Sequence, residues 1–400
     1  MTKFLFCNVP YQGHINPTLP VVQELVKRGA KVVYYCSDKF GDIIQASGAT
    51  FRPYRISMLA TDSNKQFSDD PVIDICHNIL QQILDDARSE KANYLIYDSM
   101  CLWGMILSMI LQIPAIRTYV TFPINKCFHP LNPYSPVFPL STRNLANDQE
   151  MIKNLCSAYN LPSLIYPEFL FQAEPLNIVF HPREFHPAEA TFDEKFLFVG
   201  PSIFPRYGPS DISYNKLSSY PVLYVSLGSV FNNVLFFYDI CLAAFGNQSR
   251  QVVISTGNSI NIADFGPLPH NVIMCPHVPQ LDILQQAEVF ITHGGLNSIM
   301  EALYYEVPLV VVPQTREQRI FARRIEELEL GIAIENKTAI TAYILRKAVE
   351  QVISSKTIRT NIQNMRNMIL KSGGYTRATD AIMQLTISLK FCANGGSITR

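Results

Sequence analysis

The sequence predicts an α/β protein with two doubly wound domains, each built on a parallel sheet, that face each other across a cleft. Its length is the first reason, because 400 residues exceed the roughly 100–200 residues of an ordinary domain. The second reason is the regular alternation of short apolar strands with helical segments. The third is that this pattern starts again after residue 220 with the same order of strand, glycine-bearing turn and helix.

The chain opens with a strand, a helix and a second strand. The first strand is predicted over residues 3–9, and residues 31–36 form the second. Between them, Asn16 is expected to cap a helix that has Pro17 in its first turn and ends at Gly29. Asparagine suits the N-cap, proline the first turn and glycine the C-terminal end. Two strands joined through a helix predict a parallel sheet.

The same alternation continues through the first half of the chain. Helices are predicted over residues 78–88 and 100–111, and strands over 94–98 and 115–120. Residues 128–142 differ, because four prolines interrupt any regular pattern there. This segment is predicted to be a loop or an extended segment, either a surface excursion or a wall of a ligand site.

Linker composition over residues 201–221 sets the predicted domain boundaries. We expect an N-terminal domain over 1–205, a linker over 206–220 and a C-terminal domain over 221–400, with the last helix packing back on the N-terminal domain. Strands of the C-terminal domain are predicted over residues 222–226, 251–255, 288–292 and 308–313. The last of these is apolar throughout, as expected of a strand that is buried on both faces.

Charge and cysteine content narrow the class of protein. The formal net charge is zero, which argues against a nucleic-acid binder that neutralises phosphates. No apolar run reaches the length of a transmembrane segment, and the N-terminus lacks the pattern of a signal peptide. Nine cysteines are spaced irregularly without a C-x-x-C pair. We therefore expect a cytoplasmic protein with buried, reduced thiols rather than disulfides or a zinc site.

The most informative segment is residues 292–301, where a strand ends, two glycines follow and a helix begins. Gly295 lets the backbone approach a ligand closely, and Asn297 with Ser298 can cap the helix. The N–H groups at a helix N-terminus bind anions, and His293 adds a donor. The segment is therefore either a diphosphate site or an ordinary turn that needs glycine for its geometry.

A second candidate site lies in the first half, where His14 follows the first strand and Asp98 ends a later one. Both are expected at the carboxyl edge of the sheet, where open parallel sheets bind ligands. Near neutral pH an imidazole can take a proton from a hydroxyl. A carboxylate on the other ring nitrogen fixes the tautomer and stabilises the imidazolium. A lone histidine is more often structural, so the pairing with Asp98 is what favours catalysis.

The stretch from 277 to 318 resembles the nucleotide-sugar signature of the family 1 UDP-glycosyltransferases, and Gly13-His-Ile-Asn-Pro17 and Tyr97-Asp98-Ser99 match the same family. The chain looks most like its bacterial macrolide-type members, over essentially its whole length. The resemblance implies the GT-B fold, in which two Rossmann-like domains face a central cleft. It also implies inverting transfer of a sugar, with glucose the commonest guess, from a UDP-sugar to a hydroxyl of a small lipophilic acceptor such as a macrolide or phenolic natural product.

The resemblance further implies a role for individual residues. His14 would be the general base, oriented by Asp98. The residues implied for the base and ribose of the donor are His277, Gln280 and Glu301, and Val278 is also counted among the donor-binding residues. Those implied for the diphosphate are Ser229, His293, Gly295, Asn297 and Ser298. Those implied for the transferred sugar are Glu317 and Gln318. No metal and no further cofactor are expected, because the sequence has no Asp-x-Asp pair to hold a divalent ion.

Two positions depart from the family. His277 stands where the family often has tryptophan, which keeps a TDP-sugar donor open. Glu306 replaces a usual glycine, and only a local effect is expected there. Trp103, Met105 and Phe122 could line an apolar acceptor pocket, although such residues more often belong to the core.

A dehydrogenase and a P-loop nucleotidase are disfavoured, because neither G-x-G-x-x-G nor G-x-x-x-x-G-K-[ST] occurs. A non-hydrolysing sugar-nucleotide epimerase would share the two-domain architecture and need no acceptor. A non-catalytic, transferase-like partner protein is the last alternative. The intact His14–Asp98 pair and the phosphate segment argue against that one.

Overall fold

The computed structural model describes residues 1–55, 72–128, 145–165, 168–205, 221–336 and 339–393. Contacts divide the chain into two compact units. The first contains the described residues up to Ser202 and the chain from Ser372 onward, and the second runs from Ile203 to Lys371. The predicted linker over 206–220 and nearly all of the proline-bearing segment over 128–142 lie outside the described residues.

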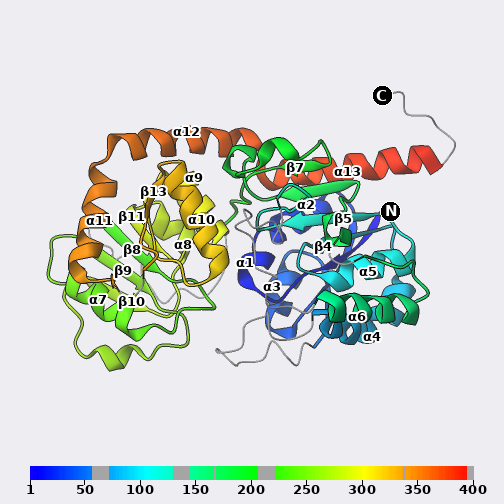
Figure 1. The fold of residues 1–400 in the computed structure, drawn as a ribbon, viewed down its shortest axis with the longest axis horizontal. Coiled ribbons are helices and arrows are strands. Elements are labelled where there is room, and N and C mark those ends of the chain that lie inside the picture. The colour runs from blue at the N-terminus through cyan, green and yellow to red at the C-terminus, as the bar shows by residue number, and fades with distance from the viewer. Residues whose placement is uncertain (56–71, 129–144, 166–167, 206–220, 337–338, 394–400) are drawn as a thin grey trace. The chain divides into compact units, whose positions relative to one another are not determined.

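The first unit is built on a parallel sheet flanked by helices (Figure 1). The sheet has seven strands in the order β3-β2-β1-β4-β5-β6-β7. Its strands are β1 Lys3–Cys7, β2 Lys31–Cys36, β3 Thr50–Pro53, β4 Tyr94–Asp98, β5 Ala115–Tyr119, β6 Leu176–Val179 and β7 Phe196–Phe198. The strand order reverses between β1 and β4. Ligands bind at such a switch point in open α/β sheets, beyond the carboxyl ends of the strands.

Helices cover both faces of this sheet, which explains why β1 and β4 in its middle are almost entirely buried. The helices are α1 Gln12–Ile15, α2 Leu19–Lys27, α3 Gly41–Ala46, α4 Val72–Glu90, α5 Leu102–Leu111, α6 Leu145–Ala158 and α13 Gly374–Ala393. Leu5 and Cys7 of β1 face a core shared with α4 and α5. Phe4 and Phe6 of the same strand face a second core shared with α2 and α13. Alternate side chains of one strand thus enter two separate cores.

The last helix, α13, belongs to the first unit. Ala378 and Ile382 are fully buried in the core that also contains residues of α2. The Tyr94 hydroxyl donates a hydrogen bond to the Thr386 carbonyl at 3.1 Å, and the Gly374 N–H donates to the Val199 carbonyl at 2.7 Å. The chain therefore returns to the N-terminal sheet at its end, and the contiguous part of the second unit stops at Lys371.

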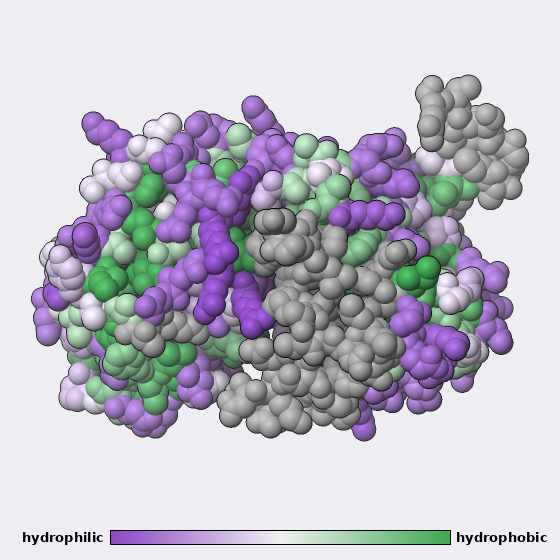
Figure 2. Space-filling model, viewed as in Figure 1, coloured by the Kyte–Doolittle hydropathy of each residue, from purple (hydrophilic) through white to green (hydrophobic). Residues whose placement is uncertain are grey.

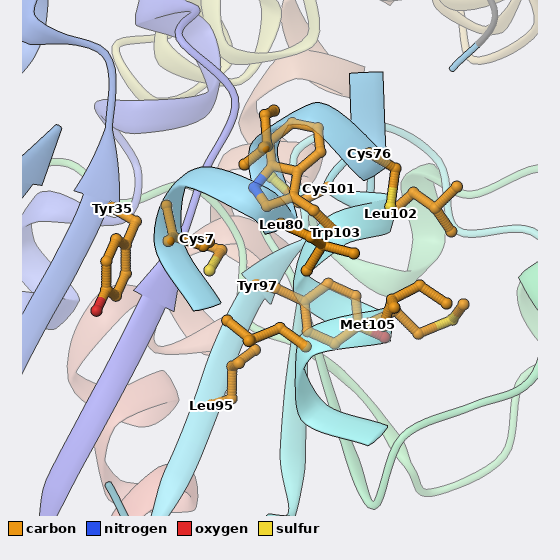
Figure 3. Close-up of a cluster of buried hydrophobic side chains, with 14 of the residues drawn as sticks. Cys7, Tyr35, Cys76, Leu80, Leu95, Tyr97, Cys101, Leu102, Trp103 and Met105 are labelled. Atoms are coloured by element: carbon orange, nitrogen blue, oxygen red, sulfur yellow. The ribbon is translucent and has the colours of Figure 1, made fainter. Parts of the chain in front are cut away.

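Trp103 and Met105 point into the core between the first sheet and α4 and α5, among Cys7, Tyr97 and other buried side chains (Figure 3). Trp103 is 1% exposed, and its ring meets that of Tyr54 edge-on with 5.8 Å between the centroids. These two residues therefore belong to the core of the first unit, which is the alternative that their residue types favour.

Eight cysteines whose side chains the structure describes are free thiols, and all of these except Cys127 are buried. Burial raises the pKa of the Cys36 thiol to about 12, so this thiol stays protonated at neutral pH. Cys7, Cys76 and Cys101 lie in the same apolar cluster as Trp103 (Figure 3). These cysteines act as small hydrophobic residues.

The second unit contains a six-stranded parallel sheet in the order β10-β9-β8-β11-β12-β13. Its strands are β8 Val222–Ser226, β9 Gln251–Ser255, β10 Val272–Cys275, β11 Ala287–Thr292, β12 Leu309–Val311 and β13 Gly331–Ala333. Its helices are α7 Leu235–Phe245, α8 Gln280–Leu284, α9 Leu296–Tyr304, α10 Arg316–Glu327, α11 Ala342–Ser354 and α12 Lys356–Ser372. Here the strand order reverses between β8 and β11, which makes the carboxyl ends of these strands the second switch point.

The predicted start of the first long helix is wrong. The first long helix, α2, begins at Leu19 with Thr18 as its N-cap, and Asn16 is the C-cap residue of the short helix α1. Pro20, rather than Pro17, lies in the first turn of α2. The extra turn that carries His14 separates strand from helix, and the capping pattern of the sequence does not reveal it.

Glu306 has a positive φ of 61°, in the left-handed region that glycine tolerates and other residues adopt at a cost. This geometry explains why the family usually has glycine at this position. The Glu306 carboxylate lies 3.3 Å from the Arg366 guanidinium in an exposed ion pair. The substitution is therefore accommodated at the surface, next to the end of α9.

On the face shown in Figure 2, hydrophilic residues cover most of the described surface, and hydrophobic residues form smaller groups. None of the helices within the described ranges is both long enough and apolar enough to cross a membrane.

His181 is fully buried in the first unit, among the rings of Phe122, Phe185 and Phe198. Its Nδ1 donates to the Pro182 carbonyl at 2.9 Å, whereas Nε2 is buried without a hydrogen-bond partner among the described residues. Burial lowers the pKa of His181 to about 4. Phe122 is itself 4% exposed, so it too belongs to the core of this unit.

Acid is expected to destabilise the first unit through His181. His181 binds a proton with a pKa near 6.5 in the unfolded chain and only near 4 in the folded chain. Its contribution to the free energy of unfolding is therefore complete above pH 6.5 and is lost as the pH falls towards 4. The loss is about 3 kcal/mol. Urea unfolding between pH 7.5 and 4.5 measures it. His181→Gln should flatten this pH dependence and the exposed-residue control His270→Gln should not; equal slopes in both variants would contradict the assignment.

Candidate functional site

His14 and Asp98 meet at the switch point of the first sheet. Asp98 is the last residue of β4, which pairs with β1, and His14 lies in α1, directly after β1. The His14 Nδ1 and Asp98 Oδ2 atoms are 2.9 Å apart. Asp98 is fully buried, and the His14 side chain is 13% exposed. A buried carboxylate thus faces one nitrogen of a ring that keeps part of its surface accessible.

The two oxygens of Asp98 have separate partners. Oδ1 accepts a hydrogen bond from the Met100 N–H at 2.8 Å, and Oδ2 faces His14 Nδ1. Because an ionised carboxylate only accepts, the proton of the neutral imidazole belongs on Nδ1. Nε2 is then the basic nitrogen, which is the state that a general base requires.

A buried hydrogen-bond network holds the turn that carries His14. The Asn8 amide donates to the His14 carbonyl at 3.1 Å and to the Tyr34 hydroxyl at 2.7 Å. The Thr18 hydroxyl donates to the Ile15 carbonyl at 2.8 Å, so Tyr34 donates to Thr18 over 2.9 Å. Sequence reasoning did not identify these residues. The only available signal was a polar side chain, Asn8, at the end of an otherwise apolar strand.

In the second unit, β11 ends at Thr292 and α9 begins at Leu296 with Gly295 as its N-cap. The prediction that Asn297 and Ser298 cap this helix is wrong, because both lie in its first turn. Glycine has no side chain to bond the N–H groups of that turn. A glycine N-cap therefore leaves the approach to the helix N-terminus unobstructed, as an anion site requires.

The His293 ring lies between two glycines. A Cβ atom at Gly228 would come within 2.7 Å of its Cε1 and Nε2 atoms, and a Cβ atom at Gly295 within 2.5 Å of Nε2. Gly228 also has a φ of 80°. Both positions thus need glycine for the ring to keep its place. Burial lowers the pKa of His293 to about 4, so at pH 7 the ring is neutral and donates through one nitrogen.

Glu301, one turn into α9, is 3% exposed, and its carboxylate Oε2 accepts from the Gln280 amide at 2.7 Å. The same amide nitrogen lies 3.3 Å from the Ser298 hydroxyl, and the Gln280 oxygen lies 3.1 Å from the Tyr224 hydroxyl. Two predicted donor residues, Gln280 and Glu301, are therefore in direct contact. Tyr224 was not identified from the sequence.

The remaining predicted donor residues lie in the same unit. Ser229 and His277 are exposed and Val278 is half-buried. The His277 Nε2 is 2.9 Å from the Asn258 amide oxygen. Glu317 is half-buried at the start of α10.

Gln318 forms a capping box with Thr315 at the start of α10. Its amide oxygen accepts from the backbone N–H groups of Gln314 and Thr315 at 2.7 and 3.1 Å. A ligand hydroxyl can therefore meet only the NH₂ end of this side chain.

The chain is similar in sequence to known proteins over nearly its whole length. Residues 240–380 match the domain family described as Erythromycin biosynthesis protein CIII-like, C-terminal domain. The chain is 38% identical over 388 residues to an NDP-glycosyltransferase of Bacillus licheniformis, which covers 94% of this chain and 95% of the relative. It is 30% identical over 396 residues to an uncharacterised UDP-glucosyltransferase of Bacillus subtilis, with 96% and 97% covered.

A solved structure has the same architecture. The crystal structure of CalG4, the calicheamicin glycosyltransferase, superposes with a TM-score of 0.83 at 29% identity and covers 96% of this chain and 98% of its own. Relatives of this identity over nearly the full length establish the family: the chain belongs to the bacterial macrolide-type family 1 glycosyltransferases and is a glycosyltransferase with the GT-B fold.

Proposed function

We propose that this enzyme transfers a sugar, with glucose as the first candidate, from a UDP-sugar to a hydroxyl of a small lipophilic natural product, with inversion. The observation that carries the proposal is the hydrogen bond between buried Asp98 and His14 at the switch point of the first sheet. The names of two relatives support the substrates, since one is an uncharacterised UDP-glucosyltransferase and the other is named the calicheamicin glycosyltransferase.

The proposed reaction is a single displacement. Nε2 of His14 takes the proton of the acceptor hydroxyl as its oxygen attacks the anomeric carbon of the sugar. The bond between that carbon and the diphosphate oxygen breaks, and the electron pair leaves with the diphosphate. An α-linked donor then gives a β-glycoside. Asp98 stabilises the imidazolium without taking the proton, and it keeps Nδ1 protonated beforehand.

The donor is proposed to bind in the second unit, at the carboxyl ends of β8 and β11. His277 and Val278 would contact the base, and Gln280 and Glu301 the ribose. The diphosphate would meet the N-terminus of α9, Ser229 and the neutral His293 ring, which supply N–H and O–H donors as negative charge develops. Glu317 and the amide N–H groups of Gln318 would contact the sugar.

We also propose that transfer needs no metal. The N–H groups at the start of α9 would meet the diphosphate charge in place of a cation. Activity measured after exhaustive treatment with EDTA is expected to equal untreated activity within error, and added Mg²⁺ is expected to leave it unchanged. Loss of activity on chelation with recovery on adding Mg²⁺ would contradict this proposal.

His277 is the observation that favours a second donor, a TDP-sugar. Its exposed ring is hydrogen-bonded to Asn258, and it offers a smaller stacking surface than tryptophan to any base. Recognition of uracil is then less strict, and thymine becomes an acceptable base.

The deciding experiment offers the pure protein UDP-glucose and a panel of macrolide and phenolic acceptors without added metal, with products read by mass spectrometry. An acceptor with one added hexose supports the proposal. Conversion of UDP-glucose to an isomer without any acceptor product would indicate an epimerase. Product from TDP-sugars alone would assign the donor to thymidine diphosphate. A protein that binds these donors but converts none would be a non-catalytic partner.

Gly228→Ala is expected to weaken UDP binding at least about tenfold, because the new methyl group must displace the His293 ring that it meets at 2.7 Å. Isothermal titration calorimetry with UDP measures the change. Gly266→Ala is the matched control, since Gly266 also has a positive φ, 65°, and an added Cβ would meet nothing within 4 Å in the described parts of the chain. Equal affinities in the two variants would argue against a phosphate site at this turn.

A further inference from the structure

We propose that Tyr224 is a positioning residue of the donor site, whose hydroxyl fixes the Gln280 amide and, through it, the Glu301 carboxylate. The inference rests on the proposed role of Gln280 and Glu301 in binding the donor ribose. It adds a residue that lies in the sheet and that touches neither the ribose nor the diphosphate in that proposal.

The sheet itself determines where the Tyr224 hydroxyl lies. Tyr224 is on β8 and Phe290 is its register partner on β11. Their rings are stacked, with 4.5 Å between the centroids and 12° between the planes. Tyr224 is 1% exposed. A ring held in this way between strands has little freedom, so its hydroxyl is a fixed point against which a mobile side chain can be aligned.

The orientation of the Gln280 amide follows from its two neighbours. The Glu301 carboxylate can only accept a hydrogen bond, so the amide NH₂ group must face it, at 2.7 Å. The amide oxygen therefore faces Tyr224, at 3.1 Å, and the phenol must donate. The hydrogen bonds run in one direction, from tyrosine to glutamine to glutamate.

The phenol remains a donor across the working pH range. Burial raises the pKa of Tyr224 above its ordinary value, a hydrogen bond with Ser226 opposes this shift, and the negative charge of Glu301 adds to it. The proton therefore stays on the hydroxyl, and the amide does not flip with pH.

This chain of hydrogen bonds fixes the orientation of the Glu301 carboxylate, because one of its oxygens accepts from the Gln280 amide. Glu301 is nearly buried in the first turns of α9, and its contact with Gln280 joins α9 to α8. Without the tyrosine donor, the glutamine amide can rotate and withdraw its N–H from the carboxylate. Glu301 would then have to be reordered each time a ribose binds, which weakens the binding.

Tyr224→Phe tests the proposal, because it keeps the ring stacked on Phe290 and removes only the hydroxyl. The expected result is a Kd for UDP about fivefold higher, the cost of ordering one side chain again on binding, with kcat unchanged at saturating donor. Tyr238→Phe is the matched control: Tyr238 is fully buried in the same unit, and its hydroxyl has no hydrogen-bond partner among the described residues. Its UDP affinity should equal that of the wild type.

A second nucleotide separates positioning from general loosening of the site. The sugar of dTDP is 2′-deoxyribose, which offers Glu301 one hydroxyl fewer than the ribose of UDP. Tyr224→Phe should therefore weaken the binding of dTDP less than the binding of UDP. In a Gln280→Met background, Tyr224→Phe should have no further effect, because its target is gone.

The possible outcomes are distinct. If the wild type binds neither UDP nor dTDP, the proposed donor is wrong, and the inference fails with it. If the wild type binds UDP and Tyr224→Phe binds it equally well, only the positioning role is overturned. Equal losses for UDP and dTDP, or a further loss in the Gln280→Met background, also overturn the positioning role, since both indicate a structural effect of the hydroxyl.

Discussion

Replacing His14 with alanine is expected to lower kcat for sugar transfer about 10³-fold to 10⁴-fold. The acceptor hydroxyl would then have no base aligned by Asp98 to take its proton. UDP binding should be unchanged, because every proposed donor residue lies in the other unit. Initial rates with a saturating UDP-sugar measure kcat, and calorimetry with UDP measures donor binding.

Two controls distinguish the loss of a general base from a general loss of structure. The turn of His14 is held through its backbone carbonyl by Asn8, a bond that alanine keeps, so the melting temperature should change little. His270→Ala removes an exposed histidine of the second unit and should leave kcat intact. A His14→Ala enzyme that retains more than a tenth of its wild-type kcat would rule out His14 as the general base.

Asp98→Asn is expected to lower kcat about 10²-fold to 10⁴-fold through the tautomer of His14. The Met100 N–H needs an acceptor, so the oxygen of the new amide stays on that side. Its NH₂ group must then face Nδ1 of His14. The ring responds by moving its proton to Nε2, the nitrogen that has to accept the proton of the substrate.

The two substitutions should not be additive. Residues that act as one unit lose their joint contribution when either is removed. The variant with both changes is therefore expected to be about as active as His14→Ala alone, measured in the same assay. If the second substitution multiplied the loss, Asp98 would act independently of His14, and the base-and-orienter assignment would be incorrect.

Much of the fold was predictable because buried parallel strands and glycine-bearing turns leave local signals. The strands at 222–226 and 251–255 coincide with β8 and β9. Boundaries were less predictable where a short helix intervenes, as at α1, because Asn16 and Thr18 are both good cap residues and only tertiary contacts decide between them.

Some residues of the candidate site were likewise predictable from the sequence, and others were not. Three residues, His14, Asp98 and His293, were predictable because they lie at or just after the ends of strands. Open α/β sheets bind their ligands at the carboxyl ends of strands, so polar residues there are candidates for a site. Tyr224 lies inside a strand and reads as an ordinary buried aromatic residue. Its partner Gln280 is 56 positions away, and no local pattern joins the two. Supporting residues of this kind become visible only when the elements that carry them are packed together.

The position of α13 has a consequence for how this enzyme folds during synthesis and for how chimeras of it can be designed. A ribosome releases the N-terminal sheet early, yet the helix that carries Ala378 and Ile382 into its core is synthesised only after the second unit. The second unit, contiguous up to Lys371, has all of its described strands available before that. A chimera that exchanges only the C-terminal half of two such enzymes would therefore give the N-terminal sheet a foreign helix. A clean exchange of units needs two crossover points, one after Ser202 and one near Ser372.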